Sequence, residues 1–197
     1  MSIICANVKI SGTRPLLFNR FTEDAIPITK QEKWGVPGNN PEEWKKTFQA
    51  TPQGQLYLDP IYIFSCLRAG GKFISKGRGT LEPEVSSTLQ VLDNKIFINR
   101  FLPPINEITR DDKRDVYIDV RPVSRRGVKN IRYRLAISSG WETEFSIIWE
   151  GTLINREQMR AICQDAGAYA GLGDARKVGF GRFHVTNFSI IQEKAHA

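Results

Sequence analysis

The sequence predicts an α+β protein with a ferredoxin-like βαββαβ (RRM-like) core, an antiparallel sheet, inserted loops and a basic hairpin. Three observations lead to this fold class. The chain starts and closes on strand-like apolar runs, at 3–10 and 183–191. Two helical patterns, at about 60–69 and 156–170, each stand before strand-like segments. Several short runs with strand character separate those two helices.

The composition favours a folded, basic protein. The chain has 197 residues, of which 41% are hydrophobic, so a core is expected and aromatic content argues against disorder. We expect a single domain over 1–197, with an insertion at about 13–55 and a β-rich insertion at about 85–135. The net charge of +7 favours an anionic partner such as nucleic acid. A merely soluble basic protein is the alternative, which only clustering of the charge distinguishes.

Cysteine usage and hydropathy bear on the compartment. Cys5, Cys66 and Cys163 are far apart, odd in number and without metal-ligand spacing. A reducing compartment fits this pattern, and no cofactor or metal is expected. The N-terminus lacks the pattern of a signal peptide, and no apolar run is long enough to span a bilayer. The sequence therefore predicts a cytoplasmic protein that does not enter a membrane.

The first strand and the segment after it differ sharply. Residues 3–10 are almost unbroken in apolar and β-branched character, which predicts a strand buried on at least one face. Ser11 and Gly12 end it. The segment 13–55 has no clear periodicity and carries five prolines, so it predicts a long loop with one helical turn around 41–48. A loop of this length in a compact domain is functional or an insertion.

The first helix has both a start and a stop signal. Asp59 is a good N-cap, Pro60 suits the first helical position, and Gly70 is a natural stop. The helix is apolar nearly all round, so we expect it to be buried. A basic, glycine-bearing surface loop follows at 72–80, with Lys72, Lys76 and Arg78.

Two hairpins are predicted between the helices. Residues 89–98 hold an Asp93-Asn94 turn between two apolar runs. Residues 116–123 and 131–137 form two further strand-like runs around a basic turn. This second hairpin carries one acidic residue, Asp119, and six cations: Arg121, Arg125, Arg126, Lys129, Arg132 and Arg134. Strand alternation places Arg132 and Arg134 on one face, which is either simply solvated or contacts a phosphate backbone.

The last third of the chain predicts a strand, a helix, a loop and a closing strand. Alternation over 145–153 indicates the strand, and Asn155 with Gln158 forms a capping pair before the helix. Five residues recur at helical spacing and are predicted to face the core: Met159, Ile162, Cys163, Ala166 and Ala170. Gly171 stops this helix.

The loop at 171–182, which we call the glycine loop, holds four glycines and three cations, Arg176, Lys177 and Arg182. Such loops make anion-binding concavities, and glycine lets a ligand approach the backbone. Dinucleotide and P-loop motifs follow a strand and open a helix. Here the order is helix, loop, strand. The pattern therefore predicts phosphate binding without a nucleotide cofactor.

Three stretches resemble the RAMP (repeat-associated mysterious protein) superfamily of CRISPR systems. The most specific is a helix followed by Gly-Leu-Gly-x-x-Arg-Lys-x-Gly-Phe-Gly-Arg at 171–182 and then a strand. Leu58-Asp59-Pro60 to Leu67-Arg68 resembles the first helix of the guide-RNA-binding backbone subunits. Val120 to Arg125, followed by Trp141 to Phe145, resembles their basic segment and the strand after it.

The resemblance implies binding of single-stranded RNA, with guide RNA and other effector-complex subunits or copies of the chain as partners. It implies contacts from the first helix, the basic hairpin and the glycine loop. The residues expected to contact RNA are Arg14, Arg20, Arg68, Lys72, Lys76, Arg78, Arg121, Arg125, Arg126, Lys129, Gly171, Gly173, Arg176, Lys177, Gly179, Gly181 and Arg182. Tyr57, Trp34 and Phe180 are candidates for stacking on bases, with core packing as the alternative role.

Some RAMP relatives cleave RNA, in certain backbone subunits with an aspartate in the loop after the first strand. Glu23 and Asp24 occupy that loop here, without a recognisable motif around them. His184 lies in the last strand with no partnered nucleophile. We therefore expect a non-catalytic RNA-binding subunit, for which RNA and single-stranded DNA are not distinguished. The alternatives are a RAMP-type endoribonuclease and a structural assembly protein that binds acidic partners.

Overall fold

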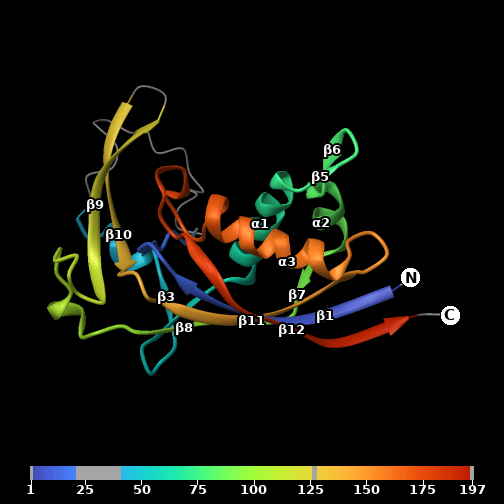
Figure 1. Cartoon of the computed structure of the whole chain (residues 1–197). Coiled ribbons are helices and arrows are strands. Elements are labelled where there is room, and N and C mark those ends of the chain that lie inside the picture. Colours follow the sequence, from blue (N-terminus) through green and yellow to red (C-terminus); the bar gives the residue numbers. More distant parts are fainter. Residues whose placement is uncertain (1, 21–40, 126–127, 196–197) are drawn as a thin grey trace, which may run out of the picture.

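A computed structural model describes residues 2–20, 41–125 and 128–195, without the side chains of 124–130 and 193–195. As predicted, the fold is α+β with a ferredoxin-like core. Helices α1 (Pro60–Gly70) and α3 (Arg156–Asp165) lie on one face of the main sheet (Figure 1). The sheet order is β12 (Phe183–Ala195), β1 (Ser2–Gly12), β11 (Glu142–Glu150), β8 (Ile96–Phe101), β4 (Gln55–Leu58) and β3 (Gln49–Ala50).

The order β12-β1-β11-β8 is the ferredoxin arrangement, in which the first and last strands lie side by side. Strand β1 is antiparallel to both neighbours, and pairs with β11 from Ile3 opposite Glu150 to Ser11 opposite Glu142. Every second residue of β1 is buried under the helices: Ile4, Ala6, Val8 and Ile10. The predicted first strand is thus confirmed. The opposite face of the sheet has no helix over it among the described residues (Figure 1).

Helix α1 begins as the sequence predicts, because the Asp59 side chain accepts a hydrogen bond of 2.9 Å from the Ile61 amide. The expectation that the helix is buried holds for one of its faces. Cys66 and Leu67 face the core, but Ile61 on the other side is 57% exposed. The cause is the two-layer architecture, in which a helix on a sheet has one face covered and one in solvent.

Helix α3 has the predicted capping box, in which the Asn155 side chain accepts from the Gln158 amide and Gln158 accepts from the Asn155 amide. The sequence predicts that this helix continues to residue 170. In the structure, its last residues form a π-helical turn instead, η5 (Ala166–Ala170). A Cβ on Gly167 of this turn would lie 2.3 Å from the Phe183 carbonyl oxygen. Glycine there lets the turn pack directly on β12.

The hairpin predicted at 89–98 is wrong. Strands β7 (Gln90–Val91) and β8 do not pair with each other, since both pair with β11. They lie end to end along it, and the Asp93 carboxylate accepts a hydrogen bond of 2.6 Å from the Ser146 amide of β11. Between α1 and β7 lie η3 (Gly71–Phe73), a small hairpin of β5 (Ser75–Lys76) and β6 (Gly79–Thr80), and α2 (Glu82–Thr88).

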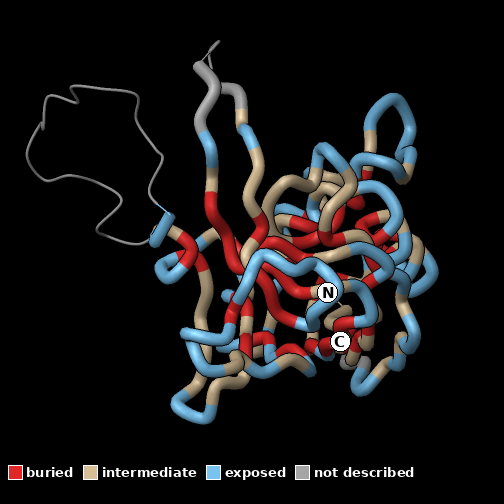
Figure 2. The backbone as a smooth tube through the Cα atoms, turned by 90° about the vertical axis from the view of Figure 1, so that its left-hand side faces the viewer, coloured by how far each residue is buried: buried red, intermediate tan, exposed pale blue. Residues whose placement is uncertain are grey.

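The basic hairpin forms as predicted, from β9 (Val116–Arg125) and β10 (Val128–Ile137). It pairs with β2 (Leu16–Leu17) in a separate three-stranded sheet that stands beside the main one (Figure 1). Burial falls from the base of the hairpin outward (Figure 2). A 3₁₀ turn, η2 (Glu43–Lys46), supplies the helical turn predicted around 41–48, and a second one, η4, spans Ile105–Glu107. Within the described residues, no helix is long and apolar enough to cross a bilayer.

Candidate nucleic-acid interface

The glycine loop joins η5 to β12 and folds against both β2 and the base of the hairpin. The Asp174 amide donates to the Leu17 carbonyl and the Gly181 amide donates to the Pro15 carbonyl, each at a distance of 2.8 Å. The Leu172 amide closes the loop on itself by donating to the Gly181 carbonyl at 2.9 Å. These bonds fix the loop between the two sheets (Figure 1). The backbone hydrogen bonds therefore hold the side chains of the glycine loop in place.

The glycines of the loop have different surroundings. All four have positive φ: Gly171, Gly173, Gly179 and Gly181. A Cβ on Gly181 would lie 1.9 Å from the Leu172 carbonyl oxygen, and one on Gly173 would lie 2.3 Å from that of Leu17. A Cβ on Gly179 would meet no atom within 4 Å. Gly181 and Gly173 thus allow the chain to pack on itself, whereas Gly179 borders open space.

The three cations of the glycine loop have no carboxylate partner among the described residues. Arg176 and Lys177 lie on a short 3₁₀ turn, η6 (Arg176–Val178), and Lys177 is exposed. One nitrogen of the Arg182 side chain donates to the Arg176 carbonyl at 3.3 Å. Its Nη1 is buried and has no hydrogen-bond partner in the described part of the chain. The loop therefore presents uncompensated positive charge.

The hairpin arginines are engaged instead. Arg134 is 4% exposed, and its Nε lies 2.8 Å from Asp174 Oδ2 in the glycine loop. Burial lowers the pKa of Arg134, and the Asp174 carboxylate opposes that effect. The expectation that Arg132 and Arg134 share an open basic face is wrong for Arg134, because the glycine loop covers it. Arg132 pairs with Glu43 of η2 at 2.7 Å.

Arg121 makes the second link between hairpin and loop. Its Nε donates to Asp119 Oδ2 at 2.7 Å, and this hydrogen bond raises the pKa of the Arg121 guanidinium. The guanidinium carbon lies 4.2 Å from the centre of the Phe180 ring. The stacking face of Phe180 that was expected to meet a base is thus already in contact with an arginine.

A cleft of about 250 Å³ opens where the hairpin meets the glycine loop. Its lining brings together three of the expected RNA contacts, Arg14, Arg121 and Gly179. The other lining residues are Pro15, Asp112, Tyr117, Val178 and Phe180. The cations of this cleft can meet phosphates, whereas its two rings are already engaged, since Phe180 lies against Arg121 and Tyr117 is buried.

The cations near the end of α1 form a second group. Nearby carboxylates compensate part of the positive charge of this group. Arg68 and Lys72 lie 3.8 and 3.3 Å from Glu82, and Lys76 lies 2.9 Å from Glu84. The cations of these pairs are exposed and the two carboxylates are partly exposed, so the pairs contribute little to stability. Arg78 has no ion-pair partner among the described residues. The group is therefore available but weaker than the glycine loop.

Other expected site residues fall elsewhere. Arg20 is exposed, and its amide donates to the Thr47 carbonyl at 2.8 Å. Asp24, Trp34 and Arg126 lie outside the described residues, and so do the side chains of Arg125 and Lys129.

Of the candidates for chemistry, only His184 lies within the described residues. His184 is exposed on β12. Burial raises the pKa of the Cys66 thiol to about 12, which keeps it protonated. In the described ranges, no three His, Cys, Asp or Glu side chains are placed to hold a metal ion.

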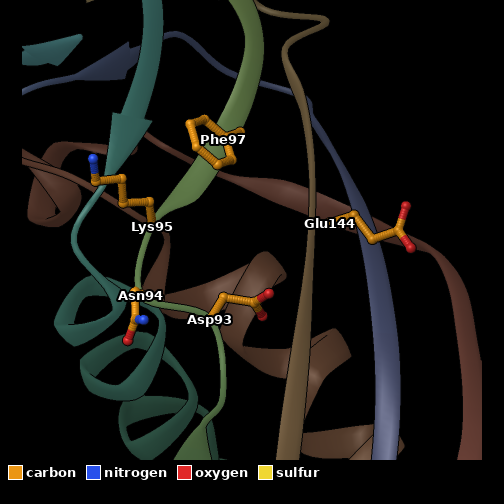
Figure 3. Close-up of a pocket in the computed structure, with 5 residues that line it drawn as sticks. All are labelled: Asp93, Asn94, Lys95, Phe97 and Glu144. Atoms are coloured by element: carbon orange, nitrogen blue, oxygen red, sulfur yellow. The ribbon is translucent and has the colours of Figure 1, made fainter. Parts of the chain in front are cut away.

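A further cleft of about 430 Å³ lies elsewhere, between β8 and β11 (Figure 3). Asp93, Asn94, Lys95, Phe97 and Glu144 line it. Two carboxylates outnumber the single cation there, so this cleft repels phosphates. Tyr57, an expected stacking residue, lies close by with the Lys95 ammonium 5.0 Å from its ring centre.

Sequence reasoning missed the acidic partners Asp174 and Glu43 and the cleft residues Asp112 and Tyr117. Asp174 stands inside the glycine motif, where a carboxylate between two glycine-rich stretches is the signal of an internal ion pair. Glu43 carries no sequence signal, because it comes from a segment that reaches the hairpin only in the folded chain.

Neither a protein-family model nor a curated protein sequence matches this chain. Among solved structures, it is similar to a chain of the Type III-B Cmr-beta complex bound to cognate target RNA. The TM-score is 0.52 at 13% sequence identity, over 97% of this chain and 61% of that one. The chain thus shares its fold with a chain of that complex, and it spans about three fifths of that chain's length.

Proposed function

We propose that this protein is a non-catalytic subunit that binds single-stranded RNA, and that it grips the backbone of a guide RNA in a CRISPR-type effector ribonucleoprotein. The observation that carries the proposal is the glycine loop, whose Arg176, Lys177 and Arg182 have no carboxylate partner among the described residues. The fold it shares with a Cmr-beta chain supports the class of partner.

The grip is electrostatic. Phosphate oxygens accept charge-assisted hydrogen bonds from Arg176 and Lys177, and Gly179 leaves room for the RNA backbone to approach. Arg14 extends the positive surface into the cleft. Such contacts tolerate any sequence, because every nucleotide carries the same phosphate. The ion pair between Arg134 and Asp174 holds the glycine loop against the hairpin and does not contact the ligand.

The test is binding of a labelled single-stranded RNA at several salt concentrations. The double variant Arg176→Ala/Lys177→Ala should weaken binding by about tenfold or more, and lower the salt slope by about 1.4, at about 0.7 per lost phosphate contact on a single strand. The matched control is Lys9→Ala/Lys95→Ala, which removes the same charge from β1 and from the segment just before β8. Unchanged affinity and slope in the first variant would refute the proposal.

The same RNA separates the two rival functions. Cleavage that disappears in Asp24→Ala or His184→Ala would establish an endoribonuclease. Absence of binding at low salt, by protein that purifies without nucleic acid, would favour an assembly protein with acidic partners. A matched single-stranded DNA of the same sequence shows whether the 2′-hydroxyls contribute.

A further inference from the structure

Two aromatic side chains on the helical side of the sheet touch each other in an exposed position. Phe73 in η3 and Tyr169 in η5 have ring centres 4.9 Å apart and planes inclined by 47°. Phe73 is 51% exposed and Tyr169 is 58% exposed. Single exposed apolar residues are common on proteins and need no explanation. A pair brought together from segments 96 positions apart is a formed aromatic surface.

Along the chain, each ring of the pair adjoins one of the two groups of cations. Tyr169 stands two residues before Gly171, at the entry to the glycine loop. Phe73 follows Lys72, and the β5–β6 hairpin with Lys76 and Arg78 comes next in the chain. In Figure 1, α1, α3 and the β5–β6 hairpin lie on the same side of the sheet as the glycine loop. An RNA strand that contacts both cationic groups can therefore also meet the two rings on this side of the sheet.

We propose that Phe73 and Tyr169 form a platform on which bases of bound single-stranded RNA stack. This inference rests on the proposed function and adds the contact that holds bases, where the glycine loop holds phosphates. The rings are already in contact, and a base inserted between them would need about 7 Å, twice the carbon contact distance of about 3.5 Å. Bases therefore stack on the outer ring faces.

Charge around the rings favours RNA over an apolar protein partner. The cations Arg68, Lys72, Lys76 and Arg78 outnumber the carboxylates Glu82 and Glu84 by four to two. A surface that combines stackable rings with a positive rim matches the two parts of a nucleotide. The aromatics expected from the sequence are less suited, because Arg121 lies over Phe180 and Lys95 over Tyr57.

The experiment compares two ligands of equal length, a single-stranded RNA and the same backbone with abasic sites in place of all bases. Phe73→Ala/Tyr169→Ala should weaken binding to the RNA by about tenfold, within the range measured for base–aromatic stacking. It should change binding to the abasic ligand less than about twofold and leave the salt slope unaltered, because phosphate contacts remain. Both rings are half exposed, so the fold should survive, as a thermal melt verifies.

The control Phe97→Ala/Phe101→Ala removes two exposed aromatics of β8, and it should leave both affinities unchanged. Tyr169→Phe keeps a ring and should bind RNA like the parent protein. Fluorescence of 2-aminopurine in the RNA should be quenched by the parent protein and less so by the double alanine variant.

Several outcomes would overturn the inference, and they differ from failure of the proposed function. Equal losses on both ligands would mean that the rings only maintain the surface. Unchanged RNA affinity, while Arg176→Ala/Lys177→Ala loses it, would remove the platform and keep the RNA-binding function. Unchanged RNA affinity with loss of self-association in gel filtration would assign the rings to a protein contact. A parent protein that binds neither ligand would refute both.

Discussion

The sequence predicts that both the glycine loop and the basic hairpin bind phosphates, yet the charged side chains of the two regions have different roles. In the hairpin, Arg121, Arg132 and Arg134 are each paired with a carboxylate. In the loop, Arg176 and Lys177 have no such partner among the described residues. A cation that is paired with a carboxylate is part of the architecture, whereas an unpaired one can meet a ligand.

The difference teaches that density of charge in a sequence does not identify the ligand-binding cations. The two regions are also coupled, because Asp174 of the loop neutralises Arg134 of the hairpin and Arg121 of the hairpin stacks on Phe180 of the loop. The hairpin arginines thus position the loop. Three substitutions test this division, ordered by the size of the expected effect.

The largest effect is expected from Gly181→Ala, which tests whether the loop is shaped by its own backbone. The new Cβ would lie 1.9 Å from the Leu172 carbonyl oxygen at a φ of +65°. Strain and overpacking together should lower the free energy of unfolding by about 3–4 kcal/mol. Gly179→Ala, with a φ of +93° and no neighbour within 4 Å, is the control and should lose about 1–2 kcal/mol. Equal losses in urea unfolding would contradict the closed loop.

Asp174→Ala tests the link between the two regions. It leaves the Arg134 guanidinium buried without its carboxylate, which should lower the free energy of unfolding by about 3 kcal/mol. Arg176→Ala should change it by less than about 0.5 kcal/mol, because no described carboxylate depends on it. Adding Arg134→Met to Asp174→Ala should recover much of the loss. A small effect of Asp174→Ala in chemical denaturation would show that the pair does not join the regions.

The smallest effect is expected from Arg132→Ala, at the outer end of the paired series. Its side chain is 36% exposed and that of Glu43 is 27% exposed, so solvent and salt screen the pair. The free energy of unfolding should fall by less than about 1 kcal/mol, and the difference should shrink in 1 M salt. A loss above about 2 kcal/mol that persists at high salt would place Arg132 in the same class as Arg134.

Much of the fold could be predicted, because its signals are local. Asp59 and Asn155 start their helices through their own side chains, and the alternation of β1 follows from the period of a strand. The hairpin at 89–98 could not be predicted correctly, because its turn signal is local but its partner is not. Asp93 bonds to Ser146 of β11, more than fifty residues away.

The candidate site divides in the same way. By itself, the sequence determined the glycine loop, with its order of helix, loop and strand and its three cations, because glycine and charge act at the position where they stand. Only the tertiary structure decided which cations are paired and which aromatics meet. Glu43 reaches Arg132, and Phe73 meets Tyr169, through chain segments about a hundred residues apart. Such contacts depend on how the layers pack against each other. The spacing of residues along the chain carries no information about this packing.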